Sequence, residues 1–183
     1  QADRMSGVIG QLLQMTRLEQ GTVPLCLEEA DLGDLAEVVC EEQRAVHPEC
    51  TIETWLEPGV TAWFDVTLIT RALQNLLENA YRYGGPRITV EVRREREDVA
   101  LSVFDDGPGI PEDQQQRIWK RFYRVETARS GGQGTGLGLP MVAQIASMHG
   151  GEASVESRPG WGTRFTLRFP AVPADQKPAA EKD

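Results

Sequence analysis

Three polar residues recur at helical spacing within the segment NLLENAYRYGG, residues 75–85. Asn75, Asn79 and Arg82 stand at positions i, i+4 and i+7, so a helix that turns about 100° per residue places them on one face. Carboxamide oxygens are hard ligands that suit Mg²⁺, and a guanidinium binds phosphate oxygens. A solvated helix face would show the same spacing, so the stripe gains meaning only beside other motifs.

A second motif, DDGPGI, follows an apolar segment that reads as a strand. Gly107 and Gly109 indicate a sharp backbone turn, and a turn alone would explain both glycines. Asp105, at the end of the strand, is also placed to accept a hydrogen bond from an exocyclic amine such as that of adenine. In that interpretation the glycines allow a flat ring to approach the backbone.

The segment GGQGTGLGL, residues 131–139, is rich in glycine and opens a predicted helix. Free backbone N–H groups and the positive end of a helix dipole favour phosphate at such a position. The segment does not fit the G-x-G-x-x-G pattern of dinucleotide folds, and the chain contains no Gly-Lys-Ser/Thr of a P-loop. Phosphate binding therefore has to be argued from several motifs together.

The segments NLLENAYRYG, DDGPGI, WKRFYR, GQGTGLGL, HGG and GWGTRFTLRFP occur in one characteristic order. In this order the sequence closely resembles the N, G1, F and G2 boxes of the catalytic ATP-binding domain of sensor histidine kinases. That domain belongs to the ATP-binding superfamily shared with gyrase, Hsp-type chaperones and mismatch-repair proteins. The resemblance covers about residues 25–170 and implies a Bergerat-type fold, ATP and Mg²⁺ as cofactors, and a two-component signalling role.

The resemblance also assigns roles to single residues. Asn79 would hold Mg²⁺ with Asn75 beside it, while Arg82 and Tyr83 would line the phosphate and ribose side. Asp105 would accept the adenine amine. Further residues expected to bind the nucleotide are Gly107, Gly109, Ile110, Phe122, Tyr123, Gly134, Thr135, Gly136, Leu137, Gly138, Leu139 and Thr163, the last of these through water.

The F box, Phe122 to Arg124, would contribute to catalysis. The resemblance makes Arg124 the contact to the γ-phosphate, so that Asn75, Asn79, Arg82 and Arg124 form the expected catalytic set. The family usually has Phe-Glu where this chain has Trp119-Lys120, which leaves the packing beside the glycine loop open.

A phosphoacceptor histidine is missing from the expected context. The family's acceptor is followed by Glu and, a few residues on, by Thr-Pro, whereas His47 precedes Pro48 and His149 precedes Gly150. We expect His47 to be a surface residue, His149 to end a helix, and the acceptor to lie upstream of this chain. The expected partners are the phosphoacceptor hairpin domain of the same kinase, within a homodimer, and the receiver domain of a response regulator.

Two other functions remain open at this stage. In clamp ATPases such as gyrase B and the mismatch-repair proteins, a Glu occupies the position of Asn75 and acts as general base, which an amide cannot do. Glu78 would replace it only if it reached the same site, and it lies about 60° away around the helix. A nucleotide-sensing module without kinase activity would carry the same binding motifs.

Composition restricts the class of protein further. The chain has 183 residues with 40% hydrophobic side chains, enough for one main domain. Its formal charge of −9 argues against binding nucleic acid or an anionic membrane through a broad basic surface. The three cysteines form no C-x-x-C pair, so we expect reduced thiols and no metal cluster. With no long apolar run, we expect a cytoplasmic location for this part of the chain and leave open whether its parent is anchored in the membrane.

The hydrophobic pattern predicts an α/β sandwich: a mixed, mostly antiparallel sheet covered on one face by three helices and preceded by another helix. We expect residues 1–22 to be the end of a hairpin helix, 23–170 to be the catalytic domain and 171–183 to be a disordered tail. Predicted helices span 3–19, 31–45, 66–83, 112–122 and 137–149, with Asp31 and Asp65 as N-caps. Predicted strands span 24–29, 51–57, 60–64, 87–95, 99–106, 152–158 and 163–170.

Overall fold

The computed structural model describes residues 2–125 and 134–176, with side chains from residue 5 onward. Its centre is a five-stranded sheet in the order β2-β4-β5-β7-β6. The strands are β2 (Thr51–Leu56), β4 (Arg87–Glu95), β5 (Asp98–Asp105), β6 (Glu152–Arg158) and β7 (Gly162–Pro170). β2 pairs with β4 in parallel, and the other three pairings are antiparallel, which confirms the predicted mixed sheet.

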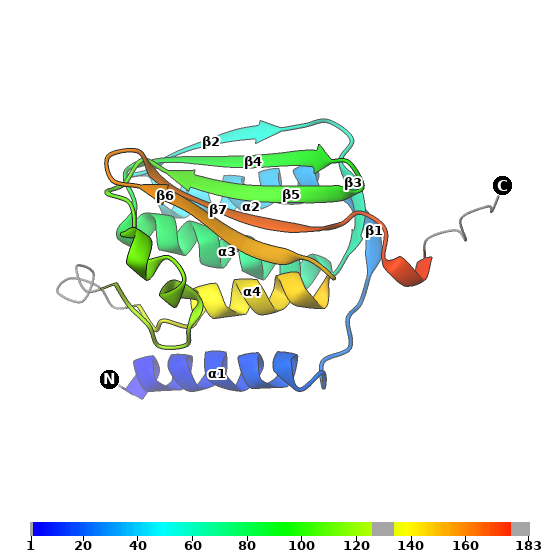
Figure 1. The fold of residues 1–183 in the computed structure, drawn as a ribbon, viewed down its shortest axis with the longest axis horizontal. Helices are drawn as coiled ribbons and strands as arrows, with labels where there is room; N and C mark the ends of the chain where they lie inside the picture. Colours follow the sequence, from blue (N-terminus) through cyan, green and yellow to red (C-terminus); the bar gives the residue numbers. More distant parts are fainter. Residues whose placement is uncertain (1, 126–133, 177–183) are drawn as a thin grey trace.

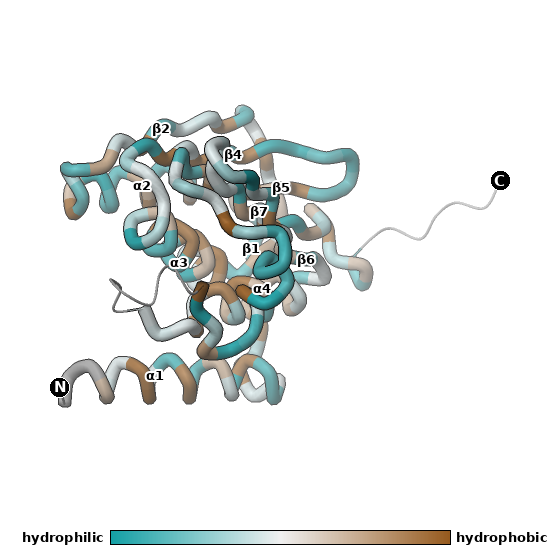
Figure 2. The backbone as a smooth tube through the Cα atoms, turned by 60° about the vertical axis from the view of Figure 1, so that its left-hand side comes forward, coloured by the Kyte–Doolittle hydropathy of each residue, from teal (hydrophilic) through white to brown (hydrophobic). Residues whose placement is uncertain are grey.

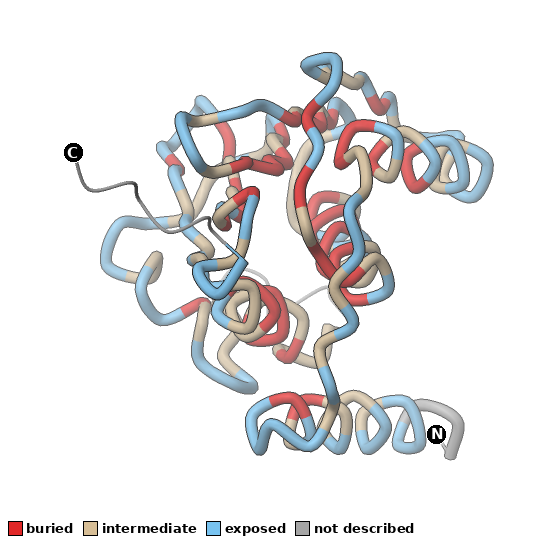
Figure 3. The backbone as a smooth tube through the Cα atoms, turned by 90° about the vertical axis from the view of Figure 1, so that its right-hand side faces the viewer, coloured by how far each residue is buried: buried red, intermediate tan, exposed pale blue. Residues whose placement is uncertain are grey.

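Three helices cover one face of this sheet: α2 (Leu32–Val46), α3 (Val66–Tyr83) and α4 (Gly138–Met148). In Figure 1, α3 and α4 lie below the strands and α2 is seen behind them, with α1 (Ala2–Glu19) outside this layer, next to α4. Buried residues gather between the sheet and the helices (Figure 3), because each strand and helix turns its apolar side to this space. The three covering helices were predicted from the sequence, and their positions are confirmed.

Helix α3 starts where the sequence predicted. The side chain of Asp65 accepts a hydrogen bond from Leu68 N, and its other oxygen accepts one from Cys26 N. The helix buries one apolar stripe, including Leu73, Leu76 and Leu77, against the sheet. The polar stripe predicted from the sequence lies beside this apolar face and is thereby fixed in orientation.

The predicted helix over residues 112–122 is wrong. The structure has two separate 3₁₀ turns there, Glu112–Gln114 and Arg117–Trp119. Of these residues only Ile118 is buried, so an α-helix would have no apolar stripe to pack. The side chain of Gln115 instead donates to the carbonyl oxygens of Ile110 and Ser157 and holds the chain against the sheet.

The predicted strand over residues 24–29 is displaced. The strand β1 (Glu28–Asp31) pairs with β3 (Thr61–Phe64) in a separate two-stranded sheet. Pro24 has no N–H for a ladder, and the N–H of Cys26 donates to Asp65 instead of to a strand. Asp31 ends β1 and caps α2 by accepting from Gly33 N and Asp34 N, as predicted.

Helix α1 is amphipathic, and Figure 2 shows hydrophobic and hydrophilic residues alternating along it. Met15 and Leu18, near its end, are buried, whereas Met5, Ile9 and Leu13 are exposed. Contacts with α4 anchor the buried end. Among the described residues, no helix is both long and apolar enough to cross a membrane.

The ordered chain continues past the domain end expected at residue 170. Ala171 is buried, donates to Glu97 O and accepts from Trp63 N. A 3₁₀ turn, Ala174–Gln176, follows. The rest of the expected tail, residues 177–183, lies outside the described residues.

Candidate functional site

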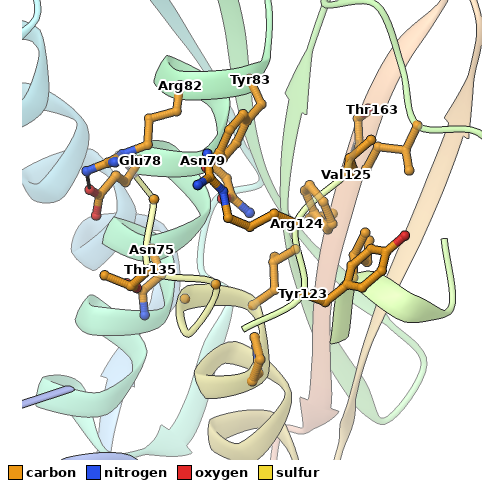
Figure 4. A pocket seen from close by; sticks show the side chains of 18 of the residues that line it. Asn75, Glu78, Asn79, Arg82, Tyr83, Tyr123, Arg124, Val125, Thr135 and Thr163 are labelled. Atoms are coloured by element: carbon orange, nitrogen blue, oxygen red, sulfur yellow. Dashed lines mark hydrogen bonds and ion pairs between the residues drawn. The ribbon is translucent and has the colours of Figure 1, made fainter. Parts of the chain in front are cut away.

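A cavity of about 540 Å³ lies where α3, α4 and the strands β5 and β7 meet. Another wall is formed by residues 108–110, Ile118 and residues 123–125, and residues 134–136 also line the cavity. Figure 4 shows polar side chains from α3 on one side and Thr163 of β7 on the other, with Arg124 between them. The motifs quoted from the sequence therefore meet at one place although they lie up to 88 residues apart, from Asn75 to Thr163.

Asp105 and Thr163 form one end of the cavity, which we call the base end because the sequence predicts the adenine base there. They are register partners on β5 and β7 and are 5% and 4% exposed. Burial raises the pKa of Asp105 to about 6, and hydrogen bonds from the backbones of Gly107 and Gly85 offset part of that rise. A buried carboxylate with free lone pairs toward a cavity is suited to a hydrogen-bond donor on a ligand.

The glycine turn beside Asp105 is possible only without a side chain. Gly109 has φ +83°, and a Cβ built there would lie 2.6 Å from Arg158 O. The N–H of Gly107 donates to Asp105 Oδ1 at 2.9 Å. The turn thus serves two purposes that the sequence left as alternatives: it reverses the chain, and it brings Gly109 and Ile110 into the cavity wall.

The polar stripe of α3 lines the opposite end, which we call the phosphate end because the sequence predicts the phosphates there. Asn75 and Asn79 both face the cavity, and Asn75 Nδ2 is buried without a hydrogen-bond partner among the described residues. A buried donor without a partner is costly, and a ligand oxygen would satisfy it. Arg82 also borders the cavity, where its guanidinium pairs with Glu78, as Figure 4 shows.

The glycine segment closes the phosphate end. Gly136 has φ +70°, and a Cβ there would lie 2.7 Å from the Cα of Phe122. The Phe122 N–H donates to Gly136 O, which ties the F box to this segment. Thr135 Oγ1 donates to Gln11 of α1, so the first helix also touches the cavity. Residues 126–133, which include the start of the glycine-rich segment, lie outside the described residues.

Most of the residues expected to bind a nucleotide border the cavity. They are Asn75, Asn79, Arg82, Tyr83, Asp105, Gly109, Ile110, Tyr123, Arg124, Gly134, Thr135, Gly136, Gly138, Leu139 and Thr163. Three expected residues have other positions. Gly107 packs against Gly84 behind the wall, Leu137 is fully buried, and the side chain of Phe122 is 56% exposed to solvent.

Several lining residues were not expected from the sequence: Gln11, Glu78, Pro108, Ile118, Val125, Pro140 and Phe165. Glu78 and Pro108 lie inside quoted motifs, and Pro140 directly follows one, so all three could have been included. Phe165 lies two positions after Thr163 on β7, and side chains at this spacing point to the same face of a strand. The predicted strand therefore already indicated that Phe165 faces the cavity. Trp119 packs edge-on against Phe165, with ring centroids 5.9 Å apart, and fills the place where the family usually has Phe.

The family model described as histidine kinase-, DNA gyrase B- and HSP90-like ATPase matches residues 64–173, more than half of the chain. The chain belongs to this family. Asp105, Thr163 and the polar stripe of α3 all fall within the matched residues. The predicted family and the ATP-binding character of the domain are confirmed.

The relatives by sequence are sensor kinases. The chain is 35% identical over 180 residues to the signal transduction histidine-protein kinase AfsQ2 of Streptomyces coelicolor, covering 98% of this chain and 32% of that protein. It is 31% identical over 188 residues to the sensor-like histidine kinase SenX3 of Mycolicibacterium smegmatis, covering 100% and 49%. The chain thus spans about a third to a half of the length of these curated relatives.

A solved structure, full-length ShkA in complex with AMPPNP, shares the fold with a TM-score of 0.79 and 27% identity. The likeness covers 92% of this chain and 36% of that one. The similarities in sequence and in structure agree: the chain corresponds to the ATP-binding catalytic domain of sensor histidine kinases.

Proposed function

We propose that this domain binds ATP with Mg²⁺ and transfers the γ-phosphoryl group to a histidine on a hairpin domain outside this chain. The phosphoryl group then passes to the receiver domain of a response regulator. The observation that carries the proposal is one cavity with a buried acceptor pair at one end and, at the other, an amide donor that has no partner among the described residues. The two ends suit the base and the triphosphate of one nucleotide.

At the base end, Asp105 accepts from the exocyclic amine, and Thr163 supports this contact. The wall formed by Gly109 and Ile110 lies against the face of the ring. Because Asp105 is ionised above its pKa of about 6, it can only accept at neutral pH. This arrangement favours adenine over a base whose ring edge offers an acceptor at the same position.

At the phosphate end, the donor set fits a hard cation shared with phosphate. Asn79 would supply an amide oxygen to Mg²⁺, and bound Mg²⁺ neutralises charge on the phosphate oxygens. Among the described residues, no group of three or more His, Cys, Asp or Glu side chains could hold a metal ion by itself. We therefore propose a Mg²⁺ site in which phosphate oxygens of the nucleotide supply ligands that the protein does not.

The chain's own residues then position the reacting group. Asn75 donates to a phosphate oxygen the amide hydrogen that has no partner in the part of the chain that the structure describes. Arg124 holds the γ-phosphate and stabilises the charge of the transition state. The glycine segment supplies backbone N–H groups at the start of α4. Phosphoryl transfer depends mainly on such positioning and charge, and the acceptor nitrogen comes from the hairpin domain.

The described residues of the cavity include no suitable general base for the hydrolysis that a clamp ATPase performs. Asn75 cannot act as a general base, and the carboxylate of Glu78 is paired with Arg82 at the rim. His47 pairs with Glu49 on the surface, and both ring nitrogens of the half-buried His149, at the end of α4, contact the backbone, so neither is placed as an acceptor. Hydrolysis by the domain alone should therefore be slow.

The test is incubation with γ-labelled ATP, with and without a separately produced hairpin domain that carries its histidine. We expect acid-labile, alkali-stable label on the hairpin domain and none on this chain. A hairpin domain with its histidine replaced by alanine is the control and should stay unlabelled. Label on His47 or His149, or rapid ATP turnover without any acceptor, would contradict the proposal and favour the clamp ATPase.

A further inference from the structure

Three hydroxyl or carboxyl side chains lie side by side across the end of the sheet. Thr163 of β7 is the register partner of Ser157 on β6 and of Asp105 on β5. All three are buried, with exposed fractions of 4%, 9% and 5% in that order. Thr163 and Asp105 line the cavity, whereas Ser157 lies behind Thr163. Ser157 is not among the residues that the sequence or the proposed function assigned to the site.

The hydroxyl group of Ser157 makes three contacts, each 2.8 Å long. Its oxygen accepts from the N–H of Ile110, and it lies against the carbonyl oxygen of Gly162 and against Thr163 Oγ1. A carbonyl oxygen cannot donate, so the single hydrogen of Ser157 goes to Gly162. The N–H of Ile110 uses one lone pair, and the contact with Thr163 is a hydrogen bond only if Thr163 donates.

The hydrogen of the Thr163 hydroxyl is therefore turned away from the cavity. Toward the cavity Thr163 presents lone pairs, and the ionised Asp105 beside it also presents lone pairs. A water molecule held between Asp105 and Thr163 would donate one hydrogen to each of them, so it could only accept a hydrogen bond from the ligand. With or without this water molecule, the base end of the cavity therefore selects a ligand that donates a hydrogen bond.

We propose that Ser157 is a positioning residue for base specificity: by holding the hydrogen of Thr163, it makes the base end accept a 6-amino purine and reject a 6-oxo purine. The inference rests on the proposed ATP-binding function and adds a residue outside the cavity wall. An unpaired acceptor facing the oxygen of a 6-oxo base is unfavourable, because two acceptors then meet without a hydrogen between them.

The experiment compares binding of ATP and inosine triphosphate by calorimetry at pH 8, where Asp105 is ionised. Inosine triphosphate differs from ATP by an oxygen in place of the 6-amino group and the accompanying ring N–H. In Ser157→Ala the Thr163 hydroxyl is free to rotate and donate to that oxygen. The preference for ATP should fall by about tenfold, mostly through tighter binding of inosine triphosphate.

A matched control exists on the same sheet. Ser102 of β5 is 3% exposed, and its hydroxyl forms a 2.8 Å hydrogen bond with that of Thr166 on β7. Both residues lie an odd number of positions from Asp105 and Thr163, so their side chains point to the face of the sheet away from the cavity. Ser102→Ala removes the same kind of pair and should cost similar stability. It should leave the ratio of the two affinities unchanged, which separates a specific effect from general loosening of the sheet.

The outcomes separate the two levels of the argument. If the wild-type protein binds neither nucleotide, or does not prefer ATP, the proposed function itself fails. If the wild type prefers ATP and folded Ser157→Ala keeps the full preference, the role of Ser157 is overturned. Should Ser157→Ala not fold, Thr163→Ser must keep the preference and Thr163→Val must lose it, and equal ratios in these two variants overturn the inference.

Discussion

The two ends of the cavity differ in how many of their polar groups already have partners within the protein. At the base end, Asp105, Ser157 and Thr163 are buried and joined to the backbone or to each other. At the phosphate end, Asn75 keeps a buried donor without a partner among the described residues. If the nucleotide binds as proposed, the base end is already formed before it arrives, whereas the nucleotide completes the phosphate end.

The largest effect should come from Arg124→Ala at the phosphate end. We expect the rate of phosphoryl transfer to the hairpin domain to fall by about 10²–10³, because the arginine meets charge that develops in the transition state. Affinity for ATP should change much less. Arg117→Ala, an exposed arginine outside the cavity wall, is the control for lost positive charge. If single-turnover and binding measurements show equal losses, Arg124 serves binding alone.

Asn79→Ala should separate the metal from the rest of the phosphate end. With Mg²⁺ present we expect ATP to bind about 10–100-fold more weakly, whereas in EDTA the change should be small, because the lost group is a metal ligand. Gln74→Ala removes an exposed amide from the same helix outside the cavity and should change neither value. Equal weakening in both buffers would remove the metal role of Asn79.

The division into a preformed and an unfinished end also explains what the sequence could predict. Asp105, Thr163 and the α3 stripe were predictable because each lies at a fixed position in a motif or on a helix face. Gln11 reaches the cavity from α1 through a contact 124 residues away in sequence, with Thr135, which no local pattern shows. The 112–122 segment was mispredicted because Gln115 bonds to the backbone of Ile110 and of the distant Ser157 instead of supporting a helix.

Acidification should weaken the base end by about tenfold. Burial raises the pKa of Asp105 to about 6, and the adenine amine needs the ionised carboxylate, so ATP affinity should decrease by this factor as the pH falls from 7 to 5. Asp105→Asn cannot titrate there and should bind more weakly at pH 7 but with a flatter profile. Calorimetry across this range decides the point, and parallel profiles for the two proteins would count against the adenine contact.

The smallest effect concerns a contact that holds α3 and α4 together at their far ends. His149 Nε2 accepts from Asp65 N at 3.0 Å, and burial lowers the pKa of His149, so the folded protein favours the neutral ring. That stability is present above the ordinary pKa of about 6.5 and is lost as the pH falls below it.

His149→Phe should therefore cost about 1 kcal/mol at pH 8, because the Asp65 N–H loses its acceptor while a ring still packs against Phe169. Urea unfolding at pH 8 and 5.5 measures this. The gap between the variant and the wild type should narrow at the lower pH, and a gap that widens would contradict the assigned neutral role.

The placement of the nucleotide across the two ends can be tested most directly by NMR on the ¹⁵N-labelled protein. We predict that adenosine alone shifts the amide signals of Gly107 to Ile110 and of Thr163, with little change at Asn75, Asn79 or Gly136. ATP with Mg²⁺ should shift both groups of signals. The account would be contradicted if adenosine perturbed the α3 stripe, or if ATP with Mg²⁺ left either end of the cavity unchanged.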